Sequence, residues 1–371
     1  MTFTAYRTLG KSGLIVSPLA LGTMTFGAGR WGANEQTSRA LFDAYVDMGG
    51  NFIDTADIYS GGESERMLGT FLADSKSRDR LVVATKAGFP REQGIPLSGG
   101  NGAKNIRLAI ERSLQRLKTD YIDMYWMHVW DRTTPAEEVL QTLTDAVRAG
   151  KILHYGFSNT PAWYVAKIAT LAAVHGLPGP IGLQYAYSLI DRGVELDLVP
   201  AGQEFGLGLV PWGPLAAGLL TGKYGREKLS DAGRATGLPD KGSEVGDGAG
   251  GGRLNGDNPY GGMLFTERNF DVVDALKQVA AEVGRSPAEV ALAWVANRPG
   301  VSSVLIGASR VEQLTQNVAS LDIRLTEAQQ TALERATALP LLNPYFIFNL
   351  PTSRLFGGQH VSAWGGPAPT A

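Results

Sequence analysis

The chain has 371 residues, of which 44% are hydrophobic, so it can bury a large core as one large α/β domain or as two smaller ones. Lys and Arg number 34 against 36 Asp and Glu, and this balance excludes the basic face of a nucleic-acid-binding protein. The lack of cysteine excludes disulfides, thiolate metal sites and a cysteine nucleophile, and no apolar run has the length of a signal peptide or a membrane span. We expect a cytoplasmic protein with neither a nucleic-acid nor a membrane partner.

The predicted elements begin with a hairpin and continue as a repeat of strand and helix. The stretch 5-AYRTLGKSGLIVSP-18 predicts a β-hairpin, and apolar residues recur at helical spacing in 34–50, 104–118 and 135–151. Eight short apolar runs are predicted to be strands: PLALG (18–22), NFIDT (51–55), LVVATK (81–86), YIDMYWMH (121–128), ILHYGFS (152–158), IGLQYA (181–186), LGLVPW (207–212) and SVLIG (303–307). Because alternating strands and helices are typical of parallel βαβ units, we predict an α/β fold, a closed (β/α)8 TIM barrel with the hairpin covering its lower end.

Two segments interrupt this repeat. Residues 224–266 are rich in Gly, Asp and Pro without periodicity, which predicts a long loop after the seventh strand. From about residue 340 the chain is aromatic and rich in turns, and we expect this C-terminal tail to lie over the barrel mouth. We therefore predict one domain over 1–371, with the barrel at about 15–337 and the tail at 338–371.

A glycine-rich stretch offers an alternative fold. Residues 27-GAGRWG-32 match G-x-G-x-x-G between an apolar run and a helix, and Asp54 follows about 20 residues later, as in a dinucleotide-binding Rossmann domain. Trp31 argues against this alternative, because a bulky side chain stands where the backbone would approach a pyrophosphate. A Rossmann sheet also concentrates its nucleotide contacts in the first half of the chain, whereas here polar residues follow nearly every strand.

These polar residues stand at the carboxyl ends of the predicted strands, which meet at one mouth of a barrel. Taken singly, each has an ordinary structural explanation: Asp54 as a helix cap, Tyr59 as a rim aromatic, Lys86 as a solvated strand end and His128 as a hydrogen-bonded core histidine. That explanation accounts poorly for the joint placement of eight residues, which are Asp54, Tyr59, Lys86, His128, Ser158, Asn159, Gln184 and Trp212.

The first four of these residues together predict a proton donor beside an oxygen-binding pocket. A tyrosine hydroxyl, with an ordinary pKa of about 10, is a poor acid at neutral pH unless a cation such as Lys86 stabilises its phenolate. Asp54 would keep Lys86 charged and in place, and neutral His128 would donate a hydrogen bond to a substrate oxygen. This chemistry needs no metal, and hydride is the natural species to be delivered to the carbon as the oxygen is protonated.

The sequence resembles the aldo-keto reductase family from the N-terminal hairpin to about residue 337. The blocks that carry the resemblance occur in the family's order: NFIDTADIYSGGESERMLG, VVATKAG, YIDMYWMHVWD, GFSN, LQYAYSLIDR, VPWGPLAAGLLTGKY and LIGASRVEQLTQN. The resemblance implies a catalytic tetrad of Asp54, Tyr59, Lys86 and His128, in which Tyr59 is the proton donor and His128 orients the carbonyl. It implies an NAD(P)H-dependent oxidoreductase that reduces an aldehyde or ketone to the alcohol, reversibly, by hydride transfer.

The resemblance also implies where the cofactor would bind. The nicotinamide and its ribose would contact the strand ends through Gly22, Thr23, Met24, Asp54, Ser158, Asn159, Gln184 and, stacked on the ring, Trp212. The pyrophosphate would lie along Gly213, Pro214, Leu215, Ala217, Gly218 and Lys223, with Arg253 of the long loop folded over the cofactor. The adenosine end would contact Gly307, Ser309, Arg310, Gln313, Gln316 and Asn317.

Two positions depart from the family pattern. Gly213 stands where many members carry a serine that contacts the phosphates, and Gly307 where some carry a lysine for the 2′-phosphate. Ser309, Arg310 and Arg253 are the groups left for that phosphate. NADPH is expected in preference to NADH.

The predicted substrate is a fairly bulky, apolar aldehyde or ketone, because the barrel mouth is rich in aromatic residues. Its pocket would be lined by Phe26, Trp31, Tyr59, Trp126 and His128. A cofactor-binding regulatory subunit, similar to the reductase-like β subunits of potassium channels, is the competing function. Beyond a small-molecule carbonyl or alcohol the motifs indicate no partner, and they leave the oligomeric state open.

Overall fold

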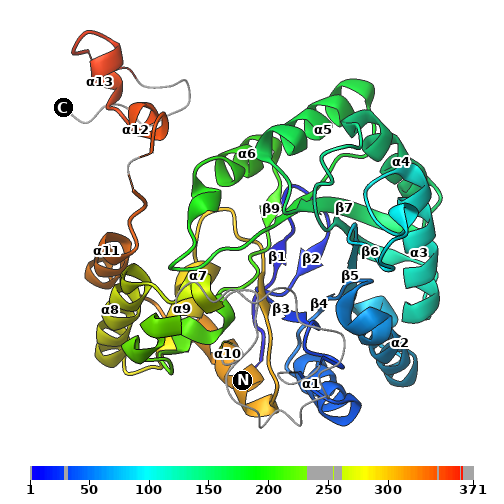
Figure 1. The fold of residues 1–371 in the computed structure, drawn as a ribbon, viewed down its shortest axis with the longest axis horizontal. Helices are drawn as coiled ribbons and strands as arrows, with labels where there is room; N and C mark the ends of the chain where they lie inside the picture. The colour runs from blue at the N-terminus through cyan, green and yellow to red at the C-terminus, as the bar shows by residue number, and fades with distance from the viewer. Residues whose placement is uncertain are drawn as a thin grey trace. The chain divides into compact units, whose positions relative to one another are not determined.

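Eight parallel strands form the central sheet of the protein (Figure 1). The computed structural model describes residues 2–28, 32–231, 254, 261–340, 342–359 and 361. The strands are hydrogen-bonded in the order β10-β3-β4-β5-β6-β7-β8-β9. Their bounds are β3 (Leu19–Gly22), β4 (Phe52–Asp54), β5 (Val82–Ala87), β6 (Ile122–Met127), β7 (Ile152–Ser158), β8 (Gly182–Gln184), β9 (Gly208–Leu209) and β10 (Val304–Ile306). Each predicted strand overlaps one of these.

Contacts between the chain at β9 and the chain at β10 close the sheet into a barrel. Leu209 forms a parallel bridge with Val301, and Leu305 donates its backbone N–H to the Pro211 carbonyl over 2.9 Å. The predicted (β/α)8 TIM barrel is therefore confirmed. The Rossmann alternative is wrong, because these strands follow one another in chain order, whereas the order of a Rossmann sheet reverses at its centre.

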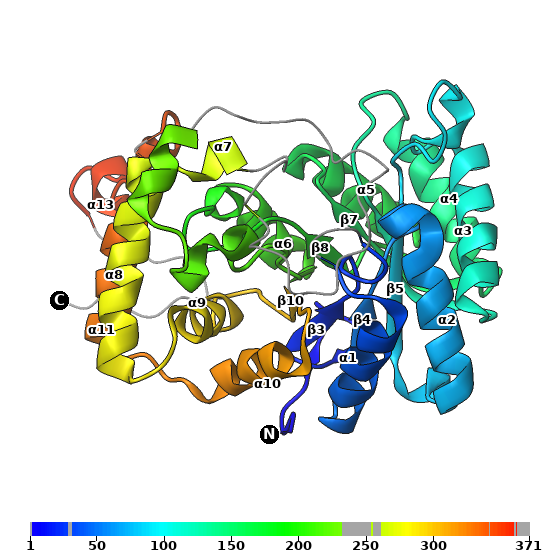
Figure 2. The same ribbon diagram turned by 60° about the horizontal axis from the view of Figure 1, so that its bottom comes forward.

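Helices surround the strands, and helices consecutive in the chain from α1 to α6 pack side by side (Figure 1, Figure 2). Their bounds are α1 (Glu35–Asp47), α2 (Glu63–Ser75), α3 (Ala103–Leu117), α4 (Ala136–Arg148), α5 (Ala162–His175), α6 (Leu198–Phe205), α7 (Gly261–Leu264), α8 (Glu267–Val283), α9 (Pro287–Ala296), α10 (Val311–Ala319) and α11 (Glu327–Ala336). Side chains fix where helices begin: Asn34 caps α1, and Ser286 with Glu289 forms a capping box at α9. Among the helices of the described ranges, none has the length and apolar character needed to span a bilayer.

The predicted N-terminal hairpin is present at the amino-terminal end of the barrel strands. Its strands β1 (Arg7–Thr8) and β2 (Ile15–Val16) pair antiparallel. Leu9 and Val16 are fully buried against the apolar side chains of the barrel interior. Arg7 donates from Nη1 to the Ala296 and Val301 carbonyls over 2.8 and 3.1 Å, which ties the hairpin to the chain before β10.

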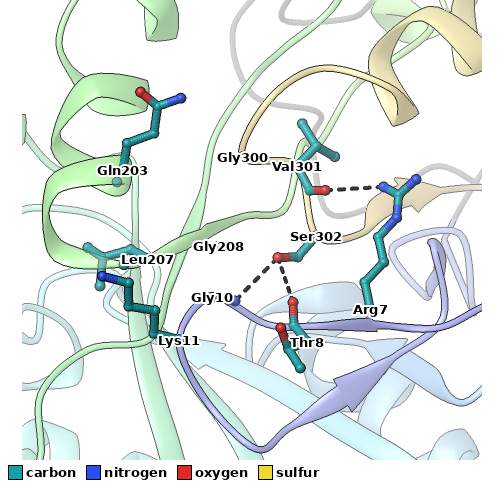
Figure 3. Close-up of a pocket in the computed structure, with 12 residues that line it drawn as sticks. Arg7, Thr8, Gly10, Lys11, Gln203, Leu207, Gly208, Gly300, Val301 and Ser302 are labelled. Carbon is teal, nitrogen blue, oxygen red and sulfur yellow. Dashed lines mark hydrogen bonds between the residues drawn. The ribbon is translucent and has the colours of Figure 1, made fainter. Parts of the chain in front are cut away.

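A cavity of about 320 Å³ lies beside this hairpin (Figure 3). Figure 3 shows Ser302 accepting a hydrogen bond from the Gly10 backbone and donating one to the Thr8 carbonyl at its wall. The lining residues belong to the hairpin, to the chain before and at the start of β9 and to the chain before β10: Arg7, Thr8, Gly10, Lys11, Gly202, Gln203, Gly206, Leu207, Gly208, Gly300, Val301 and Ser302. These are the amino-terminal ends of the strands, so the cavity is separate from the predicted site at the carboxyl ends.

Apolar side chains fill the barrel interior, and Trp126 on β6 is the largest of them. Glycines on the two following strands make room for its ring. A Cβ atom at Gly156 would lie 2.7 Å from Cζ3 of Trp126, and one at Gly182 would lie 2.9 Å from Cη2. The indole therefore extends sideways over β7 and β8, and the interior is a packed core rather than a channel.

The chain divides into two compact units, Met1–Thr337 and Ala338–Ala371. The first unit contains the barrel. The second contains the short helices α12 (Tyr345–Phe348) and α13 (Thr352–Leu355). That residues 338–371 lie over the barrel mouth stays a prediction. The description of the whole chain as one domain with a C-terminal tail also stays a prediction. Of the loop predicted at 224–266, the structure describes 224–231, 254 and 261–266.

Candidate active site

Lys86, near the carboxyl end of β5, is the centre of a buried polar cluster. Its Nζ donates hydrogen bonds to the Asp54 carboxylate, to the Thr55 carbonyl over 2.7 Å and to the Tyr59 hydroxyl over 3.3 Å. Asp54 ends the neighbouring strand β4, where it pairs in register with Ala84. The side chains of Lys86 and Asp54 are each only 1% exposed. Three of the four predicted tetrad residues are therefore connected through one ammonium group.

Burial and charge pairing oppose each other in this cluster. Burial disfavours the charge on Lys86, but the Asp54 carboxylate and the Tyr59 oxygen outweigh it and raise the pKa of the ammonium. Burial also raises the pKa of the Asp54 carboxyl, against the charge of Lys86 and the hydrogen bond from Gln184. The pairing thus lets the buried Lys86 present a positive charge to Tyr59.

Tyr59 begins the 3-10 helix η1 (Tyr59–Gly62) in a tight turn after β4. The next residue, Ser60, has a φ of 49° in the left-handed region and donates from Oγ to the Phe26 carbonyl over 2.9 Å. This turn directs the Tyr59 side chain back over Lys86, whose Nζ lies 4.8 Å from the ring centroid. Tyr59 is half-buried, and its hydroxyl accepts a hydrogen bond from Lys86.

His128 follows β6 directly and lies beside Tyr59, with ring centroids 6.0 Å apart and planes at 84°. Its backbone N–H donates to the Ala87 carbonyl, and its carbonyl accepts a hydrogen bond from Asn159, each over 2.9 Å. Burial and the charge of Lys86 hold the pKa of the imidazole well below its ordinary value, so the ring is neutral at pH 7. Within the described ranges its Nδ1 is buried without a hydrogen-bond partner.

Residues predicted to contact the nicotinamide lie around this tetrad. Gln184 at the end of β8 donates from Nε2 to Oδ1 of Asp54 over 2.9 Å, and Thr23 donates from Oγ1 to the Asp54 carbonyl over 3.1 Å. Asn159 donates to Ser158 Oγ over 2.9 Å and has a φ of 47°. Gln184, Thr23 and Ser158 are buried and Asn159 is exposed, whereas Gly22 and Met24 at the end of β3 are half-buried.

The segment after β9 provides an open, irregular surface. Trp212 is half-buried and donates its backbone N–H to the Tyr185 carbonyl over 2.8 Å. Gly213 has a φ of 66°, and a Cβ there would meet nothing within 4 Å. Ala217 and Gly218 follow with φ values of 53° and 97° in a tight turn, in which the N–H groups of Ala216 and Gly218 donate to the Gly213 and Leu215 carbonyls over 2.8 and 2.9 Å. Of the other predicted residues here, Pro214 is buried, Leu215 is half-buried and Lys223 is exposed.

The residues predicted for the adenosine end surround the start of α10. Arg310 is the exposed N-cap of this helix, and its side chain makes no capping hydrogen bond. Gln313 accepts hydrogen bonds from the backbone and hydroxyl of Ser309, and Asn317 donates to the Gly307 carbonyl at 3.5 Å. A Cβ at Gly307 would meet nothing within 4 Å, and Gln316 is exposed. Open glycines, an irregular backbone turn and exposed cations at adjacent strand ends fit a dinucleotide.

The aldo/keto reductase family model matches residues 18–338, nearly the whole first unit. The chain belongs to the aldo/keto reductase family. Members of this family use nicotinamide cofactors, in keeping with the fit described above.

Several relatives resemble this aldo/keto reductase over almost its whole length. Norsolorinic acid reductase A of Aspergillus parasiticus is 33% identical over 362 residues, which are 94% of this chain and 85% of the relative. Aryl-alcohol dehydrogenase (NADP+) of Phanerodontia chrysosporium is 32% identical over 350 residues, 91% and 86% of the two chains. An uncharacterised oxidoreductase of Bacillus subtilis is 34% identical over 330 residues, 86% and 92%. This aldo/keto reductase is accordingly an oxidoreductase that acts on carbonyl groups.

Two aromatic residues predicted to line the substrate pocket of the reductase are completely buried. Phe26 packs edge-on against Phe71, with ring centroids 6.3 Å apart, and Trp126 lies across the interior beside Gly156. They support the site from within the core and present no surface to a ligand in this structure. The predicted residues Trp31 and Arg253 lie outside the described residues.

Phe89 is a residue of the site that the sequence analysis missed. It lies in the loop after β5, and its ring meets His128 edge-on at a centroid distance of 4.8 Å. It remains 37% exposed, so an apolar surface stands next to the tetrad. The available signal was its position three residues after Lys86, since a residue so close to that strand end must lie near the barrel mouth.

Proposed function

We propose that this protein is an NADPH-dependent carbonyl reductase that uses Tyr59 as its general acid and prefers aldehydes or ketones with an aromatic group. The observation that carries the proposal is the contact of Lys86 with both Asp54 and the Tyr59 hydroxyl. A phenol beside a buried ammonium gives up its proton more readily than a phenol in water. The exposed surface of Phe89 and the name of the relative aryl-alcohol dehydrogenase (NADP+) support the aromatic preference.

The four tetrad side chains have separate tasks in this proposal. A nicotinamide dinucleotide, when bound, supplies the hydride. Neutral His128 donates a hydrogen bond that orients the carbonyl oxygen, and Tyr59 gives that oxygen its proton as the carbon is reduced. Lys86 stabilises the resulting phenolate, and Asp54 keeps Lys86 charged and in place. In the reverse direction Tyr59 accepts the proton of the alcohol.

The chain's own groups suggest how the dinucleotide is held. Trp212 would stack on the nicotinamide, and Asn159 would bond its carboxamide. The pyrophosphate would lie along the turn from Gly213 to Gly218, with the exposed Lys223 as its cation. Arg310, exposed at the start of α10, would bind the 2′-phosphate that distinguishes NADPH from NADH.

Replacement of Tyr59 by Phe tests the proposal. Tyr59→Phe keeps the ring and removes the transferable proton, so reduction of an aromatic aldehyde should fall about 10²- to 10⁴-fold while NADPH binding stays nearly unchanged. Tyr121→Phe is the matched control, because Tyr121 stands just before the opposite end of β6, with its ring under Arg78. If Tyr59→Phe kept the wild-type kcat, Tyr59 would not be the general acid. Tight NADPH binding without turnover of any carbonyl would instead favour the regulatory subunit.

A further inference from the structure

A second buried ion pair, between Arg91 and Asp57, lies close to the tetrad and is not part of it. Nη1 of Arg91 is 3.0 Å from Oδ2 of Asp57, and Nη2 donates to Oδ1 of Asn105 over 2.6 Å. The Asp57 side chain is completely buried and that of Arg91 is 12% exposed. Removing two charges from water is costly, and such pairs are often no more stabilising than apolar residues of the same size. Fold stability alone therefore explains this pair poorly.

The pair connects the two chain segments that flank the reacting groups. Asp57 stands two residues before Tyr59, and its backbone N–H donates to the Lys86 carbonyl over 3.0 Å. Arg91 stands two residues after Phe89, in the loop between β5 and α3. The ion pair thus ties the loop that contains Phe89 to the turn that contains Tyr59.

The same loop is fixed at its other end. The Asn101 backbone N–H donates to Oδ2 of Asp131 over 2.7 Å, and its side chain donates to the Val129 carbonyl over 2.8 Å. Both partners lie in the loop that follows His128. Phe89 lies between the end of β5 at Ala87 and the paired Arg91, so the chain is held on both sides of this residue.

We propose that Arg91 and Asp57 are positioning residues that hold Phe89 against His128, so that the exposed face of Phe89 forms one wall of the substrate site and selects aromatic carbonyl compounds. This inference rests on the proposed function and adds the group that sets substrate preference. Phe89 and a substrate ring would pack as offset or edge-to-face aromatic pairs. Neither ion-pair partner contacts the substrate, and both act through Phe89.

Arg91→Met tests this inference, because methionine keeps much of the side-chain volume and removes the charged hydrogen bonds. KM for benzaldehyde should rise about 3- to 10-fold, the loss expected for one aromatic contact, with kcat changed much less. KM for propanal should stay nearly unchanged. Phe89→Ala should raise KM for benzaldehyde by at least as much, and the double variant should match Phe89→Ala alone, since Arg91 acts only through that ring.

Arg78→Met is the matched control. Arg78 pairs with Asp123 over 2.8 Å with side chains 16% and 10% exposed, at the amino-terminal end of β5 and β6. Its loss should lower the thermal midpoint and leave KM for both aldehydes unchanged. Arg91→Lys, which keeps the cation, should restore part of the benzaldehyde preference and provides a milder variant if Arg91→Met folds poorly.

The outcomes separate the two proposals. Independent, multiplicative effects of Arg91→Met and Phe89→Ala, or equal losses for benzaldehyde and propanal, would overturn the positioning role. So would an Arg91→Met enzyme with wild-type kinetics. A wild-type protein that reduces neither aldehyde with NADPH would instead overturn the proposed function itself.

Discussion

Gln184 and Asp54 are hydrogen-bonded across the barrel mouth, with Nε2 of Gln184 donating to Oδ1 of Asp54 over 2.9 Å. Their strands, β8 and β4, are on opposite sides of the barrel. The other carboxylate oxygen, Oδ2, accepts a hydrogen bond from Lys86. Both carboxylate oxygens of Asp54 therefore accept hydrogen bonds. This arrangement suits a residue that positions Lys86 and keeps it charged, rather than one that transfers a proton itself.

Asp54→Asn is expected to lower kcat and to leave NADPH binding nearly unchanged. The amide can still accept the hydrogen bond from Gln184, but it no longer supplies the charge that raises the pKa of Lys86. The kcat for reduction should fall about 10-fold or more and its pH profile should shift, because Lys86 then stabilises the Tyr59 phenolate less well. Steady-state kinetics across pH and fluorescence titration of NADPH measure the two quantities. Asp123→Asn, a buried carboxylate at the other end of the barrel, should leave kcat unchanged.

His128 is expected to stay neutral through the physiological pH range. Since burial and Lys86 lower its pKa in the folded state, its NMR signals should not titrate near pH 6.5. For the same reason kcat/KM should show no change near that pH from protonation of His128. Protonation of His128 favours the unfolded chain, so its contribution to stability is lost as pH falls below the unfolded value of about 6.5. A His128 titration near pH 6.5 would contradict this assignment.

Arg310→Ala is expected to weaken the binding of NADPH more than that of NADH. The guanidinium stands at the first turn of α10, where it and the helix N–H groups could both face the 2′-phosphate. The ratio of KM for NADPH to KM for NADH should therefore rise. Lys223→Ala is the control, because a pyrophosphate contact is common to both cofactors and its loss should raise both KM values alike. If Arg310→Ala changed KM for the two cofactors equally, Arg310 would not contact the 2′-phosphate.

Asp57 is expected to lower the free energy of unfolding as pH rises, whereas His128 lowers it as pH falls. Burial and the nearby charge of Glu65 raise the pKa of Asp57 to about 6, against the effect of Arg91. The folded state then binds this proton more tightly than the unfolded chain, in which an aspartate titrates at about 3.9. The contribution of Asp57 to the free energy of unfolding is therefore largest below about pH 4 and falls by up to about 3 kcal/mol as pH rises through about 6.

Urea unfolding of the wild type and of Asp57→Asn between about pH 4 and pH 7 measures this contribution. The variant has no carboxyl group to titrate at this position, so the free energy of unfolding of the wild type relative to that of the variant should fall as pH rises from about 4 to about 6. A constant difference across this range would show that Asp57 is ionised throughout.

The strand ends could be predicted from the sequence because buried strands are short, apolar and bounded by turns. Side-chain alternation along β5 and β6 also explains why Lys86 and Trp126, which are paired in register, both point into the barrel. This alternation predicts which face of the sheet a side chain occupies, but not how far it extends over the neighbouring strands. Trp126 extends over Gly156 and Gly182 because those residues lack a side chain, so it is buried rather than part of an open pocket wall.

The loop contacts could not be predicted in the same way. The chain from Gly88 to Gly102 has no regular period, so nothing in its sequence indicates that Arg91 pairs with Asp57, 34 residues earlier. The Thr55 carbonyl, which accepts a hydrogen bond from Lys86, is a backbone group, and its role does not depend on the identity of the side chain. These contacts follow from the closed arrangement of the strands.

The packed barrel interior decides how protons reach the reacting groups. Trp126 and the neighbouring apolar side chains separate Lys86 from the lower end, where buried Leu9 and Val16 complete the seal. Among the described residues, this packing leaves the mouth as the side from which water can exchange protons with Lys86 and Tyr59. In the proposed reaction, Tyr59 gives its proton to the substrate oxygen while ligands cover that mouth, so it would regain a proton after the product has left. Under this proposal each turnover would begin with Tyr59 already protonated.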